Sequence, residues 1–433
     1  MPWQFGRKCP SFGFNPRLMP VQAVSPPKST VFTAAVIVAA LGYFVDIYDL
    51  ILFSIVRVES LKDLGVTAAA ELTDKGLFLI NMQMGGMLVG GILWGILGDK
   101  KGRLSVLFGS ILLYSLANIA NGFVTSVEQY AWLRLIAGIG LAGELGAGIT
   151  LVSESLPKEK RGYGTMVVAT VGVSGAMLGY WVGQKLGWRN AYFVGGGLGL
   201  ALLVLRVSVF ESGMFQQVQA QADVVRGNFL SLFTNPVRLG KYLRVLLIGV
   251  PLWFVVGILV TLAPEFGRAL GLTGEVTAGL AVFWCYFGLV FGDFFSGALS
   301  QYWHSRNKAL QVFLVFCAVL VGVYLFGVQG ASPATFYGVC FVLGMSVGFW
   351  ALFVTVAAEQ FGTNLRATVA TTAPNFARGA VVGLVPAFKY LSGALGGIIP
   401  GAAVLGALSL LVAFWAVRTL PESYGKDLNY VEE

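Results

Sequence analysis

Long apolar stretches follow one another along almost the whole chain, separated by short polar connections. A helix needs about 20 mostly apolar residues to cross the ~30 Å hydrocarbon core of a bilayer. The pattern predicts twelve membrane-spanning helices, at 31–56, 76–97, 104–123, 129–152, 163–185, 189–209, 242–263, 274–297, 309–328, 334–358, 367–388 and 396–418. These stretches are rich in Gly and Ala, which lets helices approach closely in lipid. The chain is therefore expected to be an all-α membrane protein.

Composition narrows the classes further. Hydrophobic residues make up 56% and charged residues 12% of the 433 positions, against about 45–50% and about 25% in soluble domains. These values exclude a soluble enzyme, a nucleic-acid-binding protein and a disordered chain. The net charge of +8 is typical of a membrane protein whose cytoplasmic loops are basic.

The loop charges predict an orientation. With twelve spans, both termini lie on one side, and the loops of that side hold 19 Lys and Arg residues against seven on the other. Basic loops remain in the cytoplasm. The prediction is a multi-pass protein of a bacterial inner membrane with both termini cytoplasmic. Residues 1–30 have no apolar core of a secretory signal and are interpreted as a cytoplasmic tail, with Met19 an alternative start.

The chain divides into two similar halves. The longest polar connection predicts an N-terminal six-helix bundle at 31–209, a cytoplasmic loop at 210–241, a second bundle at 242–418 and a tail at 419–433. Span four ends in a Glu154-to-Arg161 segment, and span ten ends in a Glu359-to-Arg366 segment 205 residues later. Paired six-helix halves with a binding site between them are a common transporter plan.

Cofactor chemistry is not expected. His304 is the sole histidine, and the four cysteines show no paired spacing, so we expect no metal site, no cofactor, no enzymatic activity and free buried thiols. The expected partners are a small-molecule substrate, protons (with sodium as an open alternative) and the lipid bilayer, but no nucleic acid. The chain is expected to be a monomer.

The connection after span two reads Gly95-Ile-Leu-Gly-Asp99-Lys-Lys-Gly102-Arg103. This segment resembles the signature loop of the major facilitator superfamily. Span four begins with Arg134-Leu-Ile-Ala-Gly-Ile-Gly, which resembles the superfamily's fourth-helix motif. The Glu154-to-Gly162 segment after span four and Leu420-Pro-Glu-Ser after the last span resemble those of its sugar and metabolite–proton symporter branches. The resemblance implies two pseudo-symmetric six-helix bundles and a transporter.

The resemblance also implies a conformational latch between the halves. Asp99 would meet the start of span eleven and Arg103 would meet Glu154, and these contacts would break during transport. The implied latch residues are Gly95, Asp99, Gly102, Arg103, Glu154 and Arg161, with Glu359 and Arg366 as a second-half counterpart. The second half departs from the pattern because Gln301 stands where the first half has Asp99.

Charged residues lie within the predicted spans, where each costs at least ~2.5–3.5 kcal/mol and usually serves function. Asp46 and Asp49 share one face of span one, and Arg134 and Asp49 both lie about 27 Å from the cytoplasmic ends at ~1.5 Å per residue. Related symporters use a first-helix aspartate with the fourth-helix arginine for proton coupling. That role would fall on Asp46 or Asp49 with Arg134. Glu144 is either a second proton site or a structural partner.

Arg378 lies near the middle of span eleven without an acidic neighbour on its own helix. A cavity-facing guanidinium would suit an anionic substrate such as a carboxylate or phosphate ester, and the alternative is pairing with Asp293 or Glu144. Asp293 itself is expected to pack against a loop. Further candidate pocket residues are Tyr43, Tyr48, Asn81, Gln83, Trp253, Trp284, Trp350 and Asn375.

Together these features predict a proton-coupled symporter of a small polar metabolite, an organic anion, that works by alternating access. A proton-coupled drug or metabolite exporter is the first alternative, although span five lacks the Gly-Pro pair typical of such exporters. A sensor that does not transport is the alternative from another class. A membrane enzyme and a channel are disfavoured, because no catalytic constellation and no ring of like charges is present.

Overall fold

The computed structural model describes residues 34–101, 103–144, 161–211, 229 and 231–426, and all helices discussed lie within these ranges. The first part of the chain contains α1 (Ala34–Asp63), α2 (Ala69–Lys101), α3 (Arg103–Asn121), α4 (Val127–Leu141), α6 (Arg161–Val173), α7 (Gly175–Leu186) and α8 (Trp188–Glu211). The second part begins with the short α10 (Ser231–Thr234) and continues with α11 (Pro236–Phe254), η1 (Val255–Val260), α12 (Ala263–Ala269), α13 (Ala278–Tyr302), α14 (Arg306–Gly322), η2 (Val323–Gly327), α15 (Pro333–Val347), α16 (Trp350–Glu359), α17 (Thr363–Gly379), α18 (Val381–Ala394) and α19 (Ile398–Thr419).

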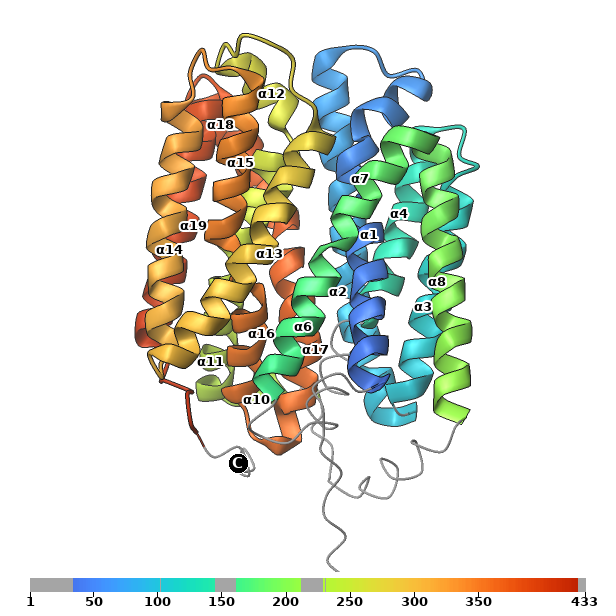
Figure 1. Ribbon diagram of the computed structural model, residues 1–433, viewed down its shortest axis with the longest axis vertical. Coiled ribbons are helices and arrows are strands. Elements are labelled where there is room, and N and C mark those ends of the chain that lie inside the picture. Colours follow the sequence, from blue (N-terminus) through green and yellow to red (C-terminus); the bar gives the residue numbers. More distant parts are fainter. Residues whose placement is uncertain (1–33, 102, 145–160, 212–228, 230, 427–433) are drawn as a thin grey trace, which may run out of the picture. The chain divides into compact units, whose positions relative to one another are not determined.

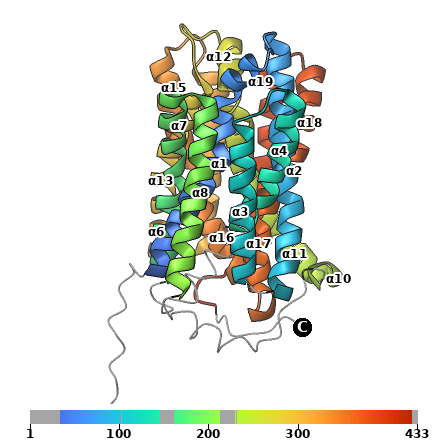
Figure 2. The ribbon, with the colours of Figure 1, turned by 90° about the vertical axis from the view of Figure 1, so that its right-hand side faces the viewer.

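These helices form two bundles, shown side by side in Figure 1. In the first bundle, α1 packs against α6, α7 and α8, and α4 packs against α2 and α3. In the second, α19 packs against α11, α14 and α18, and α13 packs against α15. The bundles meet where α2 contacts α17 and where α13 contacts α1 and α6. Figure 2 shows the same long helices running parallel to one axis after a quarter turn.

The predicted spans correspond to these helices. Among the described residues, nine helical stretches are long and apolar enough to cross a membrane. The three remaining predicted spans have local explanations: most side chains at the start of α3 lie outside those described, α4 leads into residues outside the described ranges, and the polar α17 is separated from α18 at Ala380. Cys285, Cys317 and Cys340 are free and buried, as the sequence predicted.

Several spans are broken near their middle. The tenth span ends its first half at Val347 and restarts at Trp350, after Gly348 and Phe349 leave the helical conformation. The seventh span changes from an α-helix to a π-helix at Val255, close to Pro251. Such breaks are tolerated in a membrane where neighbouring helices or side chains satisfy the freed backbone groups. They place half-helix ends at the centre of the molecule, where a transported substrate binds in many transporters.

We use two names for the ends of the bundles. The terminal face is the end where α1 begins and α19 ends, and the opposite face is the end that carries α12 (Figure 1). The first helix extends seven residues beyond its predicted boundary at 56, to Asp63. As a result Arg57, expected in an outer loop, lies within α1 and is completely buried.

Close packing of α2 on α4 depends on a glycine. A Cβ atom added at Gly86 would lie 2.1 Å from the carbonyl oxygen of Leu135, whereas one added at the neighbouring Gly85 would have nothing within 4 Å. We expect Gly86→Ala to lower the Tm of the detergent-solubilised protein, because the helices must separate. Gly85→Ala is the control and should leave Tm unchanged or raise it, since Ala favours a helix over Gly by about 0.5–1 kcal/mol. Equal Tm changes in the two variants would contradict this packing.

Candidate functional site

An ion pair joins the two bundles at their centre. Asp46 of α1 and Arg378 of α17 are both completely buried. Nη2 of Arg378 donates a hydrogen bond of 3.2 Å to Oδ2 of Asp46. The sequence predicted both residues as functional but did not pair them. Asp46 or Asp49 was expected to act with Arg134, and the structure pairs Asp46 with Arg378 instead. The alternative partners considered for Arg378, Asp293 and Glu144, are corrected to Asp46, because depth along a helix cannot show which residue of the other bundle lies opposite.

The central pair leaves much of its hydrogen-bonding capacity unused. Oδ1 of Asp46 and both Nε and Nη1 of Arg378 have no hydrogen-bond partner within the described ranges. The indole N–H groups of Trp253 and Trp350 are likewise buried and unpartnered there. Since buried polar groups are usually satisfied, a cluster of orphaned donors around one guanidinium is a candidate site for an anionic ligand.

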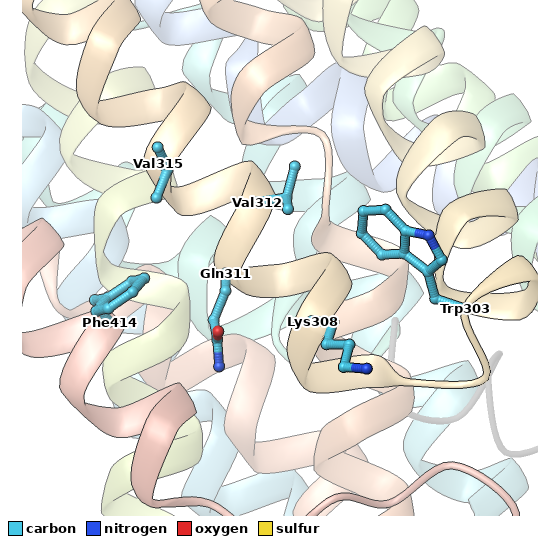
Figure 3. Close-up of a pocket in the computed structure, with 6 residues that line it drawn as sticks. All are labelled: Trp303, Lys308, Gln311, Val312, Val315 and Phe414. Carbon is cyan, nitrogen blue, oxygen red and sulfur yellow. The ribbon is translucent and has the colours of Figure 1, made fainter.

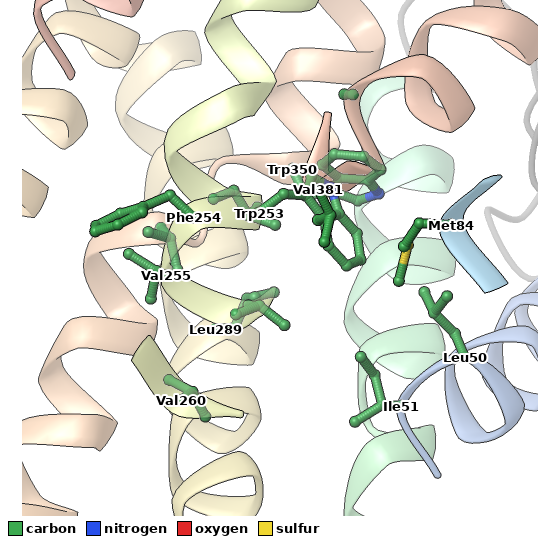
Figure 4. Packing of buried hydrophobic residues seen from close by; sticks show 14 of the residues in the cluster. Leu50, Ile51, Met84, Trp253, Phe254, Val255, Val260, Leu289, Trp350 and Val381 are labelled. Carbon is green, nitrogen blue, oxygen red and sulfur yellow. The ribbon is translucent and has the colours of Figure 1, made fainter. Parts of the chain in front are cut away.

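Two tryptophans form an aromatic wall beside Arg378. The Trp253 and Trp350 rings pack edge to face with centroids 6.0 Å apart, and the guanidinium carbon of Arg378 lies 5.9 and 5.6 Å from the two centroids. Figure 4 shows them close to Val381, with Leu50 and Met84 on helices of the other bundle. Cation–π contacts of this kind stabilise a cation by about 0.5–2 kcal/mol. The wall orients the guanidinium and offers aromatic surface.

Two more predicted pocket residues lie at the same junction. Tyr43 is buried and interacts electrostatically with Arg378, Asp46 and Asp293. Nδ2 of Asn375 donates hydrogen bonds of 2.7 Å to the carbonyl oxygen of Ala142 and of 3.0 Å to that of Thr371. The first of these bonds crosses from the second bundle to the first, so Asn375 helps to hold the bundles together next to Arg378.

Asp49 and Arg134 lie close together without a direct hydrogen bond. Asp49 is buried, interacts electrostatically with Arg134, and neither of its carboxylate oxygens has a hydrogen-bond partner in the described residues. The Arg134 guanidinium instead rests on aromatic rings, 5.6 Å from the centroids of Phe53 and Tyr192. A role of Asp49 and Arg134 in proton coupling remains a prediction. Both residues belong to the first bundle.

Glu144 has a cationic partner that the sequence analysis missed. Both carboxylate oxygens of Glu144 accept hydrogen bonds from Arg206 of α8, one of them of 3.0 Å from Nη1. Both side chains are at most 2% exposed. Arg206 lies inside the predicted span 189–209, so a search for charges within apolar runs would have found it. This pair lies wholly within the first bundle.

Asp293 was expected to pack against a loop, but the structure places it against a helix end. It is completely buried in α13, and its Oδ1 accepts a 3.0 Å hydrogen bond from the backbone N–H of Ala351. That N–H belongs to the first turn of α16, the second half of the broken tenth span. A carboxylate is favoured at a helix N-terminus by the free N–H groups and the helix dipole. The break between α15 and α16 does not show in the hydropathy pattern, so the sequence analysis could not predict this contact of Asp293.

A second ion pair joins the bundles at the opposite face. Nη2 of Arg57 donates to both carboxylate oxygens of Glu265 in α12, at 2.7 and 2.8 Å. The same guanidinium donates to the carbonyl oxygens of Leu72 and Thr261, each at 3.3 Å. Arg57 is fully buried and Glu265 is 9% exposed. We call this cluster the outer ion pair; it links α1 directly to the second bundle.

The predicted latch lies partly outside the described residues. Glu154 and Gly102 fall outside them, and the side chains of Asp99, Arg103 and Arg161 are also not described. Gly95 of α2 packs near Thr372 of α17, so the signature loop begins at the junction of the two bundles. The latch contacts themselves remain a prediction.

The predicted latch of the second half, centred on Glu359, has partners that the sequence analysis did not name. Glu359 accepts hydrogen bonds from Nη2 of Arg306 at 2.9 Å and from the hydroxyl of Ser423 at 2.8 Å. The predicted partner was Arg366, but these two contacts come from α14 and from the segment after α19. Arg306 and Ser423 lie far from Glu359 in the sequence, so no local spacing could indicate them.

Three of the four other predicted pocket residues make local contacts. Tyr48 donates a 2.8 Å hydrogen bond to the carbonyl oxygen of Ala191, and Gln83 donates one of 3.2 Å to that of Leu50, both within the first bundle. Trp284 belongs to an aromatic cluster with Phe287 and Phe341. Oδ1 of Asn81 is buried and without a hydrogen-bond partner in the described part of the chain. Of these, Asn81 alone keeps an open polar group.

The donor set does not suit a metal ion. Within the described residues there is no group of three or more His, Cys, Asp or Glu side chains that could hold one. The central site is built from one carboxylate, one guanidinium and aromatic side chains. Such a set is suited to binding an anion and moving a proton.

Comparison with known proteins agrees with this architecture. Residues 39–397 match the model of the Major Facilitator Superfamily, and the chain belongs to that family. It is 27% identical to the 3-(3-hydroxy-phenyl)propionate transporter of Escherichia coli, over 85% of this chain and 92% of that protein. It is 25% identical to the niacin transporter NiaP of Acinetobacter baylyi, over 76% and 80% of the two chains.

A solved structure shares the fold. The proton:xylose symporter XylE superposes with a TM-score of 0.69 at 16% sequence identity, covering 91% of this chain and 97% of that one. The protein is therefore a multi-pass membrane transporter with the twelve-helix architecture of the superfamily, and not an enzyme. The family resemblance found in the sequence is confirmed.

The outer ion pair gives a test of gating. Glu265→Gln should favour opening of the opposite face, because removing one partner of a buried pair costs about 3–5 kcal/mol. Cysteine introduced at the buried Ser54, which hydrogen-bonds to Thr261 beside the pair at 3.1 Å, should then react faster with a membrane-impermeant maleimide. The control Asp74→Asn breaks the exposed bundle-to-bundle pair with Lys389 and should change the rate little. Equal labelling rates in both variants would refute the gate.

Glu422 links the segment after α19 to the start of α14. Its carboxylate accepts backbone N–H bonds from Arg306 and Asn307 of α14 at 2.9 and 3.2 Å, and from Ser423 and Tyr424 at 2.9 and 3.0 Å. Burial alone would raise the pKa of Glu422, but the hydrogen bonds from Ser305 and these N–H groups hold the pKa below its ordinary value.

This linkage predicts a pH dependence of stability. Because the folded pKa of Glu422 is lowered, its contribution is fully present above the unfolded pKa, about 4.3, and is lost as pH falls through the folded value. Glu422→Gln should lower Tm at pH 7, and the difference from wild type should shrink below about pH 4. Glu71→Gln, in an exposed pair with Lys75 on the opposite face, is the control. A Tm difference for Glu422→Gln that is constant with pH would contradict the linkage.

Proposed function

We propose that the protein is a proton-coupled symporter of a small organic anion, specifically an aromatic monocarboxylate, that works by alternating access. The observation that carries the proposal is the buried Asp46–Arg378 pair at the junction of the bundles. It combines a carboxylate able to hold a proton with a guanidinium that has unused donors. The carboxylate belongs to one bundle and the guanidinium to the other, so a rocking motion would change the distance between them.

The proposed cycle follows from competition for Arg378. A substrate carboxylate that binds the free Nε and Nη1 donors shares the guanidinium with Asp46 or displaces it. A buried carboxylate that loses its cationic partner is strongly destabilised, so Asp46 then takes up a proton. Binding of the anion and protonation of Asp46 are thereby linked, and the loaded site has nearly the same net charge as the empty one. After the bundles rock, release of the anion lets Arg378 return to Asp46, and the proton leaves.

The aromatic wall and the relatives support the choice of substrate class. Niacin and 3-(3-hydroxyphenyl)propionate, the substrates named for two relatives, are each an aromatic ring with one carboxylate. The Trp253 and Trp350 rings lie beside the guanidinium, where a ligand ring could pack while its carboxylate meets Arg378. Aromatic pairs prefer such edge-to-face or offset contacts.

The proposal also includes the oligomeric state, the membrane and the orientation of the protein. The protein would act as a monomer in a bacterial inner membrane, with the terminal face in the cytoplasm and bundles at 31–209 and 242–418 that rock about the central site. The excess of basic loop residues on the terminal side supports this orientation. Asp49, Arg134 and the Glu144–Arg206 pair would tune the charge of the first bundle, and the signature loop would close the cytoplasmic side.

Transport in proteoliposomes tests the proposal. Adding nicotinate or 3-(3-hydroxyphenyl)propionate outside should raise the external pH, because protons enter with the anion; an exporter working by antiport would lower it. Asp46→Asn should abolish accumulation driven by a pH gradient while leaving substrate exchange. Arg378→Met should abolish both. Lys389→Gln, which removes an exposed pair, is the control, and full accumulation by Asp46→Asn would refute the coupling role.

The aromatic wall gives a separate prediction. Trp350→Leu should weaken binding of nicotinate by roughly 2- to 12-fold, the equivalent of about 0.5–1.5 kcal/mol for one aromatic contact, and Trp350→Phe should largely preserve it. Isothermal titration of the purified variants measures the change. Equal affinities in the Leu and Phe variants would argue against a ring-stacking role.

A further inference from the structure

A groove runs along the lipid-facing side of the second bundle, between α14 and α19. One cavity of about 580 Å³ is lined by Trp303, Lys308, Gln311 and Phe414, among others (Figure 3). A second cavity of about 460 Å³ is lined entirely by apolar residues. The two cavities share Val315 and Phe414, so they are consecutive parts of one groove.

The groove is long enough to hold a lipid acyl chain. Its lining residues on this side run from Lys308 to Phe326; at ~1.5 Å per residue this is about 27 Å, close to the ~30 Å hydrocarbon thickness. The apolar part is lined by small side chains such as Ala318, Ala403 and Ala407, which leave room for a chain of methylene groups.

The end of the groove at the terminal face is basic and aromatic. Lys308 lines the groove there, and the Arg418 guanidinium lies 5.9 Å from the centroid of the Phe414 ring, which also lines it. Lys308 and Arg418 are exposed and form no ion pair with any described residue. The carboxylate of Glu422 accepts hydrogen bonds from backbone N–H groups of α14 and of its own segment, and no ion pair joins it to either cation within the described residues.

We propose that this groove binds an anionic glycerophospholipid, with its phosphate between Lys308 and Arg418 and one acyl chain lying along the apolar part. Basic side chains between membrane helices commonly recognise anionic headgroups. Tryptophan at the headgroup level, here Trp303, is typical of the membrane interface. The site lies on the outside of the second bundle, separate from the central anion site.

The test is lipid retention, measured by native mass spectrometry after purification in a delipidating detergent with added phosphatidylglycerol or phosphatidylcholine. Wild type should retain phosphatidylglycerol preferentially, and added inorganic phosphate should not displace it, because the acyl chain contributes to binding. Lys308→Gln combined with Arg418→Gln should remove the preference. Ala407→Trp, which fills the apolar part, should reduce retention of either lipid.

Matched controls separate this site from general lipid binding. Lys75→Gln and Lys185→Gln remove two exposed basic charges elsewhere, and Val404→Trp adds a ring at an exposed α19 position outside the groove lining. These variants should retain phosphatidylglycerol as wild type does. Equal loss of lipid in controls and test variants would overturn the proposal, as would displacement by phosphate alone. A dimer that dissociates in Ala407→Trp would assign the groove to a second copy instead.

Discussion

The structure depends on how charges are accommodated in its buried interior. Asp46 and Arg378 are completely buried and come from different bundles. An isolated ion there is destabilised by several kcal/mol, whereas a well-arranged pair recovers much of that energy. Each residue therefore limits what the other can do, and any anion that approaches Arg378 alters the environment of Asp46. Under the proposed mechanism, this dependence links binding of the anion at Arg378 to protonation of Asp46.

The same constraint explains the other buried arginines of the described chain. Arg57 and Arg206 each have a carboxylate partner, whereas Arg134 lies between two aromatic rings with Asp49 nearby. The pairs differ in what they join. Arg206 is bonded within the first bundle, so it can move with that bundle as a rigid unit. The outer ion pair and the central pair cross between bundles, so the proposed rocking motion would have to break or lengthen both pairs.

The two faces of the molecule are held in different ways. At the opposite face, Arg57 and Glu265 join α1 to α12 directly. At the terminal face, the described network of Arg306, Glu359 and Ser423 joins helices of the second bundle to the segment that follows α19. The first arrangement links the two bundles to each other, while the second lies within the second bundle. Rigid bundles with breakable contacts between them are what alternating access requires.

The sequence by itself determined the membrane location, the number and order of the spans, the family, and the presence of Asp46 and Arg378 as charges within two of the spans. These follow from local properties: apolar length, motif spacing, and the high energy of a charge within an apolar run. The tertiary structure alone decided the partners. Arg378 meets Asp46, Glu144 meets Arg206, and Asp293 caps a half-helix that begins at an unpredicted break. Pairing depends on which helices pack side by side and how each is rotated, and neither is encoded in a local stretch of residues.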